Sequence, residues 1–281
     1  MKIGISAFAW TTTIRQSHLN LLTMLRDRGF DGFEIPMVDP KSIDVRACRQ
    51  AFESSGLDCT VCILLPPDVN PISPSDNVRK RALSHLSECI DVSAEIGAHL
   101  VGGPVFAPNG YLPGRTNREQ EFQWAAETFR ALGERLDSYG TTLSIEPVNR
   151  SETCFLNTAA EARLLCEAVD HPRIGVTVDT FHANIEETDT ARAVQWLGKH
   201  CKHIHMSEDD RGLLGRGNVN FPEIIAALRQ IEYEGFLTIE GFGYSPDEPD
   251  SLGAMDLHPR VSPEDIAFKG ADYLRSLINP S

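Results

Sequence analysis

Apolar residues form eight short segments along the chain, and each is followed by a longer segment with the spacing of an amphipathic helix. In the short segments, apolar and β-branched residues alternate with polar ones or run together, which predicts half-buried or fully buried strands. The predicted strands cover residues 2–8, 32–36, 57–65, 98–101, 142–146, 174–179, 202–206 and 236–240. The predicted helices cover residues 17–28, 42–55, 75–96, 117–139, 158–169, 190–198, 221–231 and 262–277. Several of these helices are followed by a glycine, which is a common helix stop.

The strict alternation of strands and helices predicts an α/β fold with a parallel sheet. Eight strand–helix units in 281 residues match a (β/α)8 TIM barrel, whose active site lies at the carboxyl ends of the strands. No linker, low-complexity segment or shift in composition divides the sequence, so residues 1–281 are expected to form a single domain. The longest irregular segments, 106–115, 209–220 and 243–261, follow predicted strands and are expected on the active-site face.

Composition and charge narrow the classes of partner. A hydrophobic content of 41% and a charged content of 23% are typical of a soluble globular protein. The net charge of −14 repels polyanions, so nucleic acid is not expected as a partner. No apolar run is long enough to cross a membrane, and the N-terminal apolar stretch is too short, with one lysine, to be a signal peptide. We therefore expect no membrane association and a cytoplasmic location.

The seven cysteines are odd in number and scattered, which argues against a disulfide framework. Cys59 and Cys62 have CxxC spacing, but they lie in an apolar, β-branched run where positions three apart face opposite ways. They are expected to be core thiols rather than a redox pair.

Ionisable residues stand at the ends of four consecutive predicted strands. Glu146 ends one strand and is followed by Pro147, and Asp179 ends the next. The third strand carries His205, and the fourth ends at Glu240. The tips of barrel strands converge on one axis, so these four side chains are expected to meet. Three carboxylates and one imidazole suit Mn²⁺, Mg²⁺ or Co²⁺ better than a structural zinc ion.

Simpler explanations exist for each residue alone. Glu146 could form a buried ion pair with Arg150, and either histidine of the pair His203 and His205 could be a hydrogen-bonded core residue. Four such groups at one depth would repel and desolvate one another without a cation, so a metal centre explains the set better.

Two of the four residues, Glu146 and Glu240, come from non-adjacent strands and could approach a substrate from different sides. One carboxylate could remove a proton from one face of a carbon, and the other could return a proton to the opposite face. The carbon must lie beside a carbonyl group for its proton to be acidic enough, which points to a ketose.

Four segments of the chain resemble the ketose 3-epimerases, which include the D-tagatose, D-allulose and L-ribulose 3-epimerases of the xylose isomerase-like barrel superfamily. These segments are IEPVNRSET (145–153), VDTFHANIEE (178–187), HIHMSEDDRGLLGRG (203–217) and IEGF (239–242). DTFHANIEE is the most specific of these strings. The alternation of elements extends the resemblance over essentially the whole chain.

The resemblance implies metal-dependent 3-epimerisation, through a cis-enediolate, of a free ketose of the D-tagatose, D-allulose/D-fructose or L-ribulose type. It also implies one divalent ion, Mn²⁺ before Co²⁺ or Mg²⁺, and a homodimer or homotetramer. The metal ligands of the family fall on Glu146, Asp179, His205 and Glu240, and its catalytic acid–base pair on Glu146 and Glu240. Its substrate-positioning residues near the O1–O3 end fall on Glu152, His182 and Arg211.

The first half of the chain matches the family less closely. Aromatic residues on early strand tips contact the far end of the sugar in the family, and Phe8, Trp10 and Phe106 are candidates here, with barrel packing as the alternative. Glu34, at the end of the second predicted strand, could line the pocket or cap a helix.

Three other functions fit parts of this pattern. An aldose–ketose isomerase, a hydroxypyruvate-type isomerase or a sugar or inositol dehydratase would use the same metal site and an enediolate. An apurinic-site endonuclease shares the barrel, but it needs a basic surface and more metal ligands than the strand tips provide. A catalytically silent sugar-binding barrel would not require a base on each face of the sugar.

Overall fold

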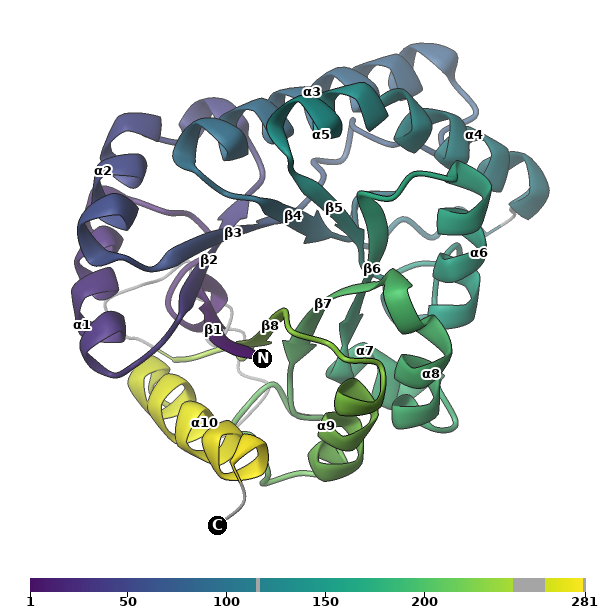
Figure 1. Ribbon diagram of the computed structural model, residues 1–281. Helices are drawn as coiled ribbons and strands as arrows, with labels where there is room; N and C mark the ends of the chain where they lie inside the picture. The colour runs from purple at the N-terminus through teal and green to yellow at the C-terminus, as the bar shows by residue number, and fades with distance from the viewer. Residues whose placement is uncertain (115–116, 245–260, 280–281) are drawn as a thin grey trace.

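The chain forms a closed barrel of parallel strands in the order β1 to β8 within residues 1–114, 117–244 and 261–279, which the computed structural model describes (Figure 1). The strands are β1 (Lys2–Ser6), β2 (Gly32–Met37), β3 (Asp58–Ile63), β4 (Leu100–Gly103), β5 (Thr142–Ile145), β6 (Ile174–Asp179), β7 (Cys201–Met206) and β8 (Phe236–Ile239). The first strand pairs with the last, with Gly4 opposite Thr238, which closes the barrel. The predicted TIM barrel is therefore confirmed.

Helices surround the strands as an outer ring (Figure 1). They are α1 (Leu21–Asp27), α2 (Val45–Ser55), α3 (Asp76–Ile96), α4 (Arg118–Ala131), α5 (Gly133–Tyr139), α6 (Ala159–Val169), α7 (Thr180–Glu186), α8 (Thr190–Leu197), α9 (Phe221–Gln230) and α10 (Pro263–Ile278). Fully buried residues such as Leu86, Ile90 and Leu228 lie on these helices. Burial of about 25 cal/mol per Å² of such apolar surface holds the ring against the strands.

Several helix ends follow from local sequence signals. The side chains of Thr158 and Ser262 accept hydrogen bonds from the first turns of α6 and α10. Gly56, Gly97 and Gly140 adopt positive φ angles directly after α2, α3 and α5, where a residue with a Cβ atom would be strained. These caps explain why the predicted ends of these helices agree with the structure.

One predicted helix is divided in the structure, and one helix of the structure was not predicted. The single helix predicted over 117–139 is two helices, α4 and α5, which meet at the fully buried Leu132 and at Gly133. Glycine is a weak helix former, which favours a break at this point. The short helix α7 was not predicted, and it begins where the Oδ1 atom of Asp179 accepts a hydrogen bond from the backbone N–H of Phe181 at 2.9 Å.

The first predicted strand, 2–8, is also shorter in the structure. The Oγ atom of Ser6 accepts a hydrogen bond from the N–H of Phe8, and residues Ala7–Ala9 turn into a 3-10 helix. The strand therefore ends at Ser6.

Two cysteines of β3 lie in the core, and none of the described helices could span a membrane. Cys59 and Cys62 are both free and buried, as predicted for core thiols. Burial raises the pKa of both thiols well above its ordinary value, so they stay protonated. Among the described residues, the helices are too short or too polar to cross a lipid bilayer.

Candidate metal centre

Four ionisable side chains meet at the carboxyl ends of the last four strands. Glu146 directly follows β5, Asp179 ends β6, His205 lies on β7 and Glu240 follows β8. All four are buried, and one donor atom from each lies within 4.8 Å of the others. The structure therefore brings together the four residues that the strand-tip pattern predicted, and we refer to this set as the acidic cluster.

Backbone packing sets the position of Glu146. Its N–H donates a 3.0 Å hydrogen bond to the carbonyl oxygen of Gly103 at the end of β4. Gly103 has a φ angle of +112°, and a Cβ atom there would lie 2.5 Å from the carbonyl oxygen of Ile63. Only glycine fits this conformation, so the turn that presents Glu146 depends on it.

The two carboxylate oxygens of Asp179 have different contacts. Its Oδ1 atom caps α7, as described above, whereas its Oδ2 atom faces a cation. That oxygen lies 2.6 Å from Nη1 of Arg211 in an ion pair. A capped, fixed carboxylate with one oxygen facing the cluster is suited to hold a cation without moving.

His205 presents one ring nitrogen to the carboxylates. Its Nδ1 atom lies 3.2 Å from Oε1 of Glu146 and 3.6 Å from Oε2 of Glu240. Its Nε2 atom points the other way, toward Glu34. The nitrogen available to a cation in the acidic cluster is therefore Nδ1.

Arg211 supplies positive charge at the edge of the acidic cluster. Its Nη1 atom lies 2.6 Å from Oδ2 of Asp179 and 2.6 Å from Oε2 of Glu240. The guanidinium group also lies over the rings of Phe181 and Phe242, at 4.2 and 5.0 Å from their centroids. The φ angle of Arg211 is +58°, which is uncommon for a residue other than glycine and indicates a tightly held loop.

Burial and charge shift the ionisation of these groups. Burial would raise the pKa of Asp179, but the charges of Arg211 and His182 hold it well below its ordinary value. Burial and the carboxylates of Asp179 and Glu146 raise the pKa of Glu240 to about 8, against the opposing charge of the cations nearby. In the absence of a metal ion, Glu240 can therefore carry a proton at neutral pH.

The donor set fits a hard divalent cation. Three carboxylates and one imidazole provide oxygen-rich coordination, which suits Mn²⁺, Mg²⁺ or Co²⁺. The carboxylates of the cluster are buried, so a cation would remove the cost of keeping them charged.

The predicted substrate residues form a connected series beside the acidic cluster. The Nε2 atom of His182 lies 3.2 Å from Nη2 of Arg211. The Nδ1 atom of His182 lies 3.2 Å from the backbone nitrogen of Asn149, whose side chain donates a 2.9 Å hydrogen bond to Glu152. His182 and Arg211 are buried and Glu152 is half-buried, so the series runs from the cluster toward solvent.

The simpler explanation of Glu146 as a partner of Arg150 is wrong. Arg150 forms its ion pair with Glu186, through contacts of 2.7–3.1 Å, and its side chain is exposed. Glu146 instead lies beside His205.

The three aromatic candidates are buried in different surroundings. Phe8 packs edge-on against Phe242, which lies under Arg211, and is therefore one ring away from the acidic cluster. Phe106 packs against Phe155. The indole N–H of Trp10 donates to Glu264 at 3.1 Å, which gives this side chain a structural role. Contact of Phe8 and Phe106 with a substrate stays a prediction.

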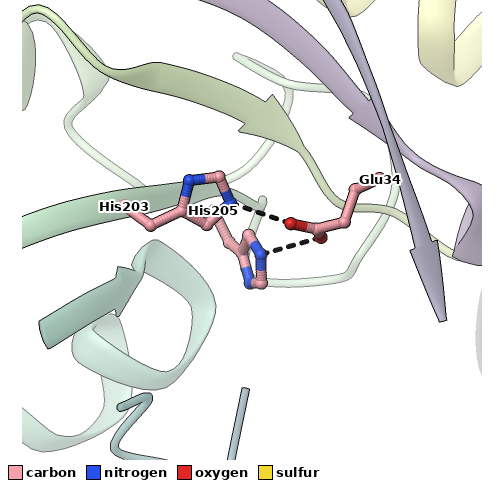
Figure 2. Close-up of side chains that lie close together, drawn as sticks. All are labelled: Glu34, His203 and His205. Carbon is pink, nitrogen blue, oxygen red and sulfur yellow. Dashed lines mark hydrogen bonds and ion pairs between the residues drawn. The ribbon is translucent and has the colours of Figure 1, made fainter. Parts of the chain in front are cut away.

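Glu34 is the residue near the site whose role the sequence left open. Figure 2 shows that its carboxylate lies against both histidines of β7, His203 and His205. Among the described residues it caps no helix, and it is 1% exposed and bonded inside the barrel. The sequence offers one sign of this role, because Glu34 is a charged residue in an otherwise apolar strand. Its partner His203 could not be recognised from the sequence, since it lies 169 positions away.

Comparison with known proteins places the chain among sugar-converting barrels. Residues 22–277 match a family model described as a xylose isomerase-like TIM barrel. The chain is 29% identical to a probable ketose 3-epimerase of Synechocystis, over 98% of this chain and 96% of that protein. It is 32% identical to an L-ribulose 3-epimerase of Mesorhizobium japonicum, over 86% of this chain and 81% of that protein. A D-allulose 3-epimerase of Methylomonas, solved with D-allulose, superimposes with a TM-score of 0.89 at 26% identity, over 98% and 96% of the two chains.

Proposed function

This chain belongs to the xylose isomerase-like TIM barrel family, and we propose that it is a metal-dependent isomerase that epimerises a free ketose at C3. The observation that carries the proposal is the burial of two glutamates, Glu146 and Glu240, in one cluster with Asp179 and His205. The names of the relatives support the reaction and the sugar class, because they include L-ribulose and D-psicose 3-epimerases.

The acidic cluster would hold the metal ion. We assign the ligand oxygens to Glu146, Asp179 and Glu240 and the ligand nitrogen to Nδ1 of His205, with Mn²⁺ as the first choice and Co²⁺ or Mg²⁺ as alternatives. A divalent cation bound there would supply Lewis acidity to the oxygens of the ketose and stabilise the negative charge that develops on them.

Glu146 and Glu240 are assigned as the acid–base pair. One carboxylate removes the C3 proton from one face of the ketose, which gives a cis-enediolate, and the protonated carboxyl group of the other returns a proton to the opposite face. The two glutamates follow non-adjacent strands, β5 and β8, which suits attack from two sides.

Glu152, His182 and Arg211 are assigned to the O1–O3 end of the ketose. Their linked contacts beside the acidic cluster support this role, because hydroxyl and carbonyl oxygens need both donors and acceptors. Phe8 and Phe106 are assigned to the far end of the sugar. A ketose of the D-tagatose, D-allulose/D-fructose or L-ribulose type is the proposed substrate.

The proposal extends to the organisation of the protein. We propose that residues 1–281 act as a single domain, and that the chain works in the cytoplasm as a homodimer or homotetramer. Light scattering coupled to size-exclusion chromatography would measure the assembly directly.

Substitution of the two glutamates tests the proposal. Glu146→Gln and Glu240→Gln should each abolish epimerisation while ketose binding stays measurable by calorimetry. Glu95→Gln changes an exposed glutamate of α3 and serves as the control with unchanged turnover. Full turnover by Glu240→Gln would refute the mechanism, and an aldose product from the unmodified protein would identify an aldose–ketose isomerase instead.

A further inference from the structure

Glu34 is a buried carboxylate that reaches from β2 to two histidines of β7 (Figure 2). Its Oε2 atom lies 2.9 Å from Nε2 of His203 and accepts a 3.1 Å hydrogen bond from the hydroxyl of Thr60. Its Oε1 atom lies 3.0 Å from Nε2 of His205. Glu34, His203 and His205 are each 1% exposed, so water does not compete for these contacts.

The placement of Glu34 decides which ring nitrogen of His205 carries a hydrogen atom. Each of its carboxylate oxygens faces one ring nitrogen, Nε2 of His203 or Nε2 of His205. A carboxylate accepts hydrogen bonds and donates none, so the ring nitrogens that face it are the ones that carry hydrogen atoms. A neutral ring of His205, the form that binds a metal ion, therefore has its hydrogen on Nε2 and its lone pair on Nδ1.

That lone pair points at the acidic cluster. Nδ1 of His205 lies 3.2 Å from Glu146 and 3.6 Å from Glu240, on the opposite side of the ring from Glu34. A histidine that binds a metal commonly donates its other N–H to a carboxylate, which fixes the ring and raises the basicity of the binding nitrogen.

We propose that Glu34 is a positioning residue, which holds His205 in the Nδ1-binding tautomer and aims this nitrogen at the cation. The inference rests on the proposed function, because it requires the acidic cluster to bind a metal ion. Glu34 comes from β2, whereas the four proposed metal ligands come from β5 to β8.

A second cation site is the competing explanation for the same three residues. Glu34, His203 and His205 offer donor atoms within 4.8 Å of one another. The contacts favour positioning, because both oxygens of Glu34 already face a ring nitrogen at 2.9 and 3.0 Å, and Thr60 donates to one of them as well. A cation there would also need the N–H of His205 to be lost.

Cobalt binding tests the inference with a readout that does not depend on turnover. We would titrate metal-free wild-type protein, Glu34→Gln and Thr60→Val with Co²⁺ and record the visible absorption of the bound ion. Glutamine keeps the shape of Glu34 but loses its charge and can offer only one acceptor oxygen to two N–H groups. The dissociation constant of Glu34→Gln should rise by about 10–100-fold, as expected when such a carboxylate is lost.

Thr60→Val is the matched control. It removes one hydrogen bond to Glu34 while leaving the 3.0 Å contact with His205 in place, so its dissociation constant should stay within about threefold of the wild-type value, well below the loss expected for a carboxylate partner. Glu34→Asp should recover part of the affinity, because it restores the charge at a greater distance.

The tautomer provides a measurement on the unmodified protein, which is decisive even if Glu34→Gln fails to fold. Proton–nitrogen NMR spectra of Zn²⁺-loaded wild-type protein should show His205 bound to metal through Nδ1 and protonated at Nε2. Binding through Nε2, an unchanged Co²⁺ affinity in Glu34→Gln, or two bound ions per chain with one lost in Glu34→Gln would each overturn the inference. If the wild-type protein binds no Co²⁺ or Zn²⁺, the proposed metal centre itself fails.

Discussion

Replacement of Arg211 by methionine should destabilise the protein strongly only when the metal ion is absent. Arg211 is the cation nearest to two buried carboxylates, with contacts of 2.6 Å to Asp179 and 2.6 Å to Glu240. Methionine fills a similar volume without the charge. Asp179 and Glu240 would then be left buried without this partner, although His205 and His182 stay nearby.

The expected cost can be worked out from this geometry. Removing one partner of a buried ion pair costs about 3–5 kcal/mol, because the other charge stays desolvated and uncompensated. In a protein of this size, about 1 kcal/mol corresponds to a change of about 2–4 °C in melting temperature, so the metal-free variant should melt roughly 6–20 °C lower than the wild type. The loss should grow as the pH rises above the pKa of Glu240, about 8, because protonation then no longer relieves the repulsion.

Saturating Mn²⁺ should remove most of this difference. A divalent ion in the acidic cluster supplies the positive charge that Arg211 provides in the metal-free protein, so the two melting curves should approach each other. Thermal unfolding followed by circular dichroism, with EDTA and then with Mn²⁺, measures both differences.

Arg49→Met is the matched control. Arg49 also pairs with a glutamate, Glu53, but both side chains are more than half exposed, so its replacement should have a small effect that is the same with and without the ion. An equal loss of melting temperature in Arg211→Met with EDTA and with Mn²⁺ would refute the electrostatic reasoning.

Two further predictions concern proton release and helix capping. Below pH 8 a cation must displace the proton of Glu240, whose pKa is raised to about 8, and that of His205, whose pKa burial would lower but the carboxylates of Glu34 and Glu146 raise well above its ordinary value. The affinity for Mn²⁺ measured by calorimetry should therefore rise by at least about tenfold per pH unit between pH 6 and pH 8. An affinity that does not change between pH 6 and pH 8 would contradict this. Thr158→Ala removes the cap of α6, where Thr158 accepts from the N–H of Glu161 at 3.2 Å, and should lower the free energy of unfolding in urea by about 1 kcal/mol without changing turnover. A loss above about 3 kcal/mol would show that Thr158 does more than cap the helix.

The acidic cluster could be predicted from the sequence because its geometry follows from the barrel. Parallel strands end on one face, so residues at the tips of consecutive strands must converge, whatever the details of packing. Glu146, Asp179, His205 and Glu240 were therefore accessible from the strand pattern alone. The helix stops at Gly56, Gly97 and Gly140 were accessible for a similar reason, since a positive φ angle at a helix end favours glycine.

Contacts across the barrel could not be predicted in the same way. Glu34 and His203 are 169 positions apart, and their meeting depends on side chains that cross the interior between β2 and β7. The pairing of Arg150 with Glu186 depends on α7, a short helix that the pattern of the sequence does not predict. A strand pattern fixes which face a residue lies on, but it does not select among the partners that share that face.

The central claim is tested most directly by proton exchange at C3 of a ketose in D₂O. Metal-free protein would be supplied with Mn²⁺, Co²⁺ or Mg²⁺ and with D-tagatose, D-fructose, D-allulose or L-ribulose, and the products would be followed by NMR. The account predicts metal-dependent incorporation of deuterium at C3 together with formation of the C3 epimer. Deuterium at C1 with an aldose product, or no exchange with any of the four sugars, would contradict it.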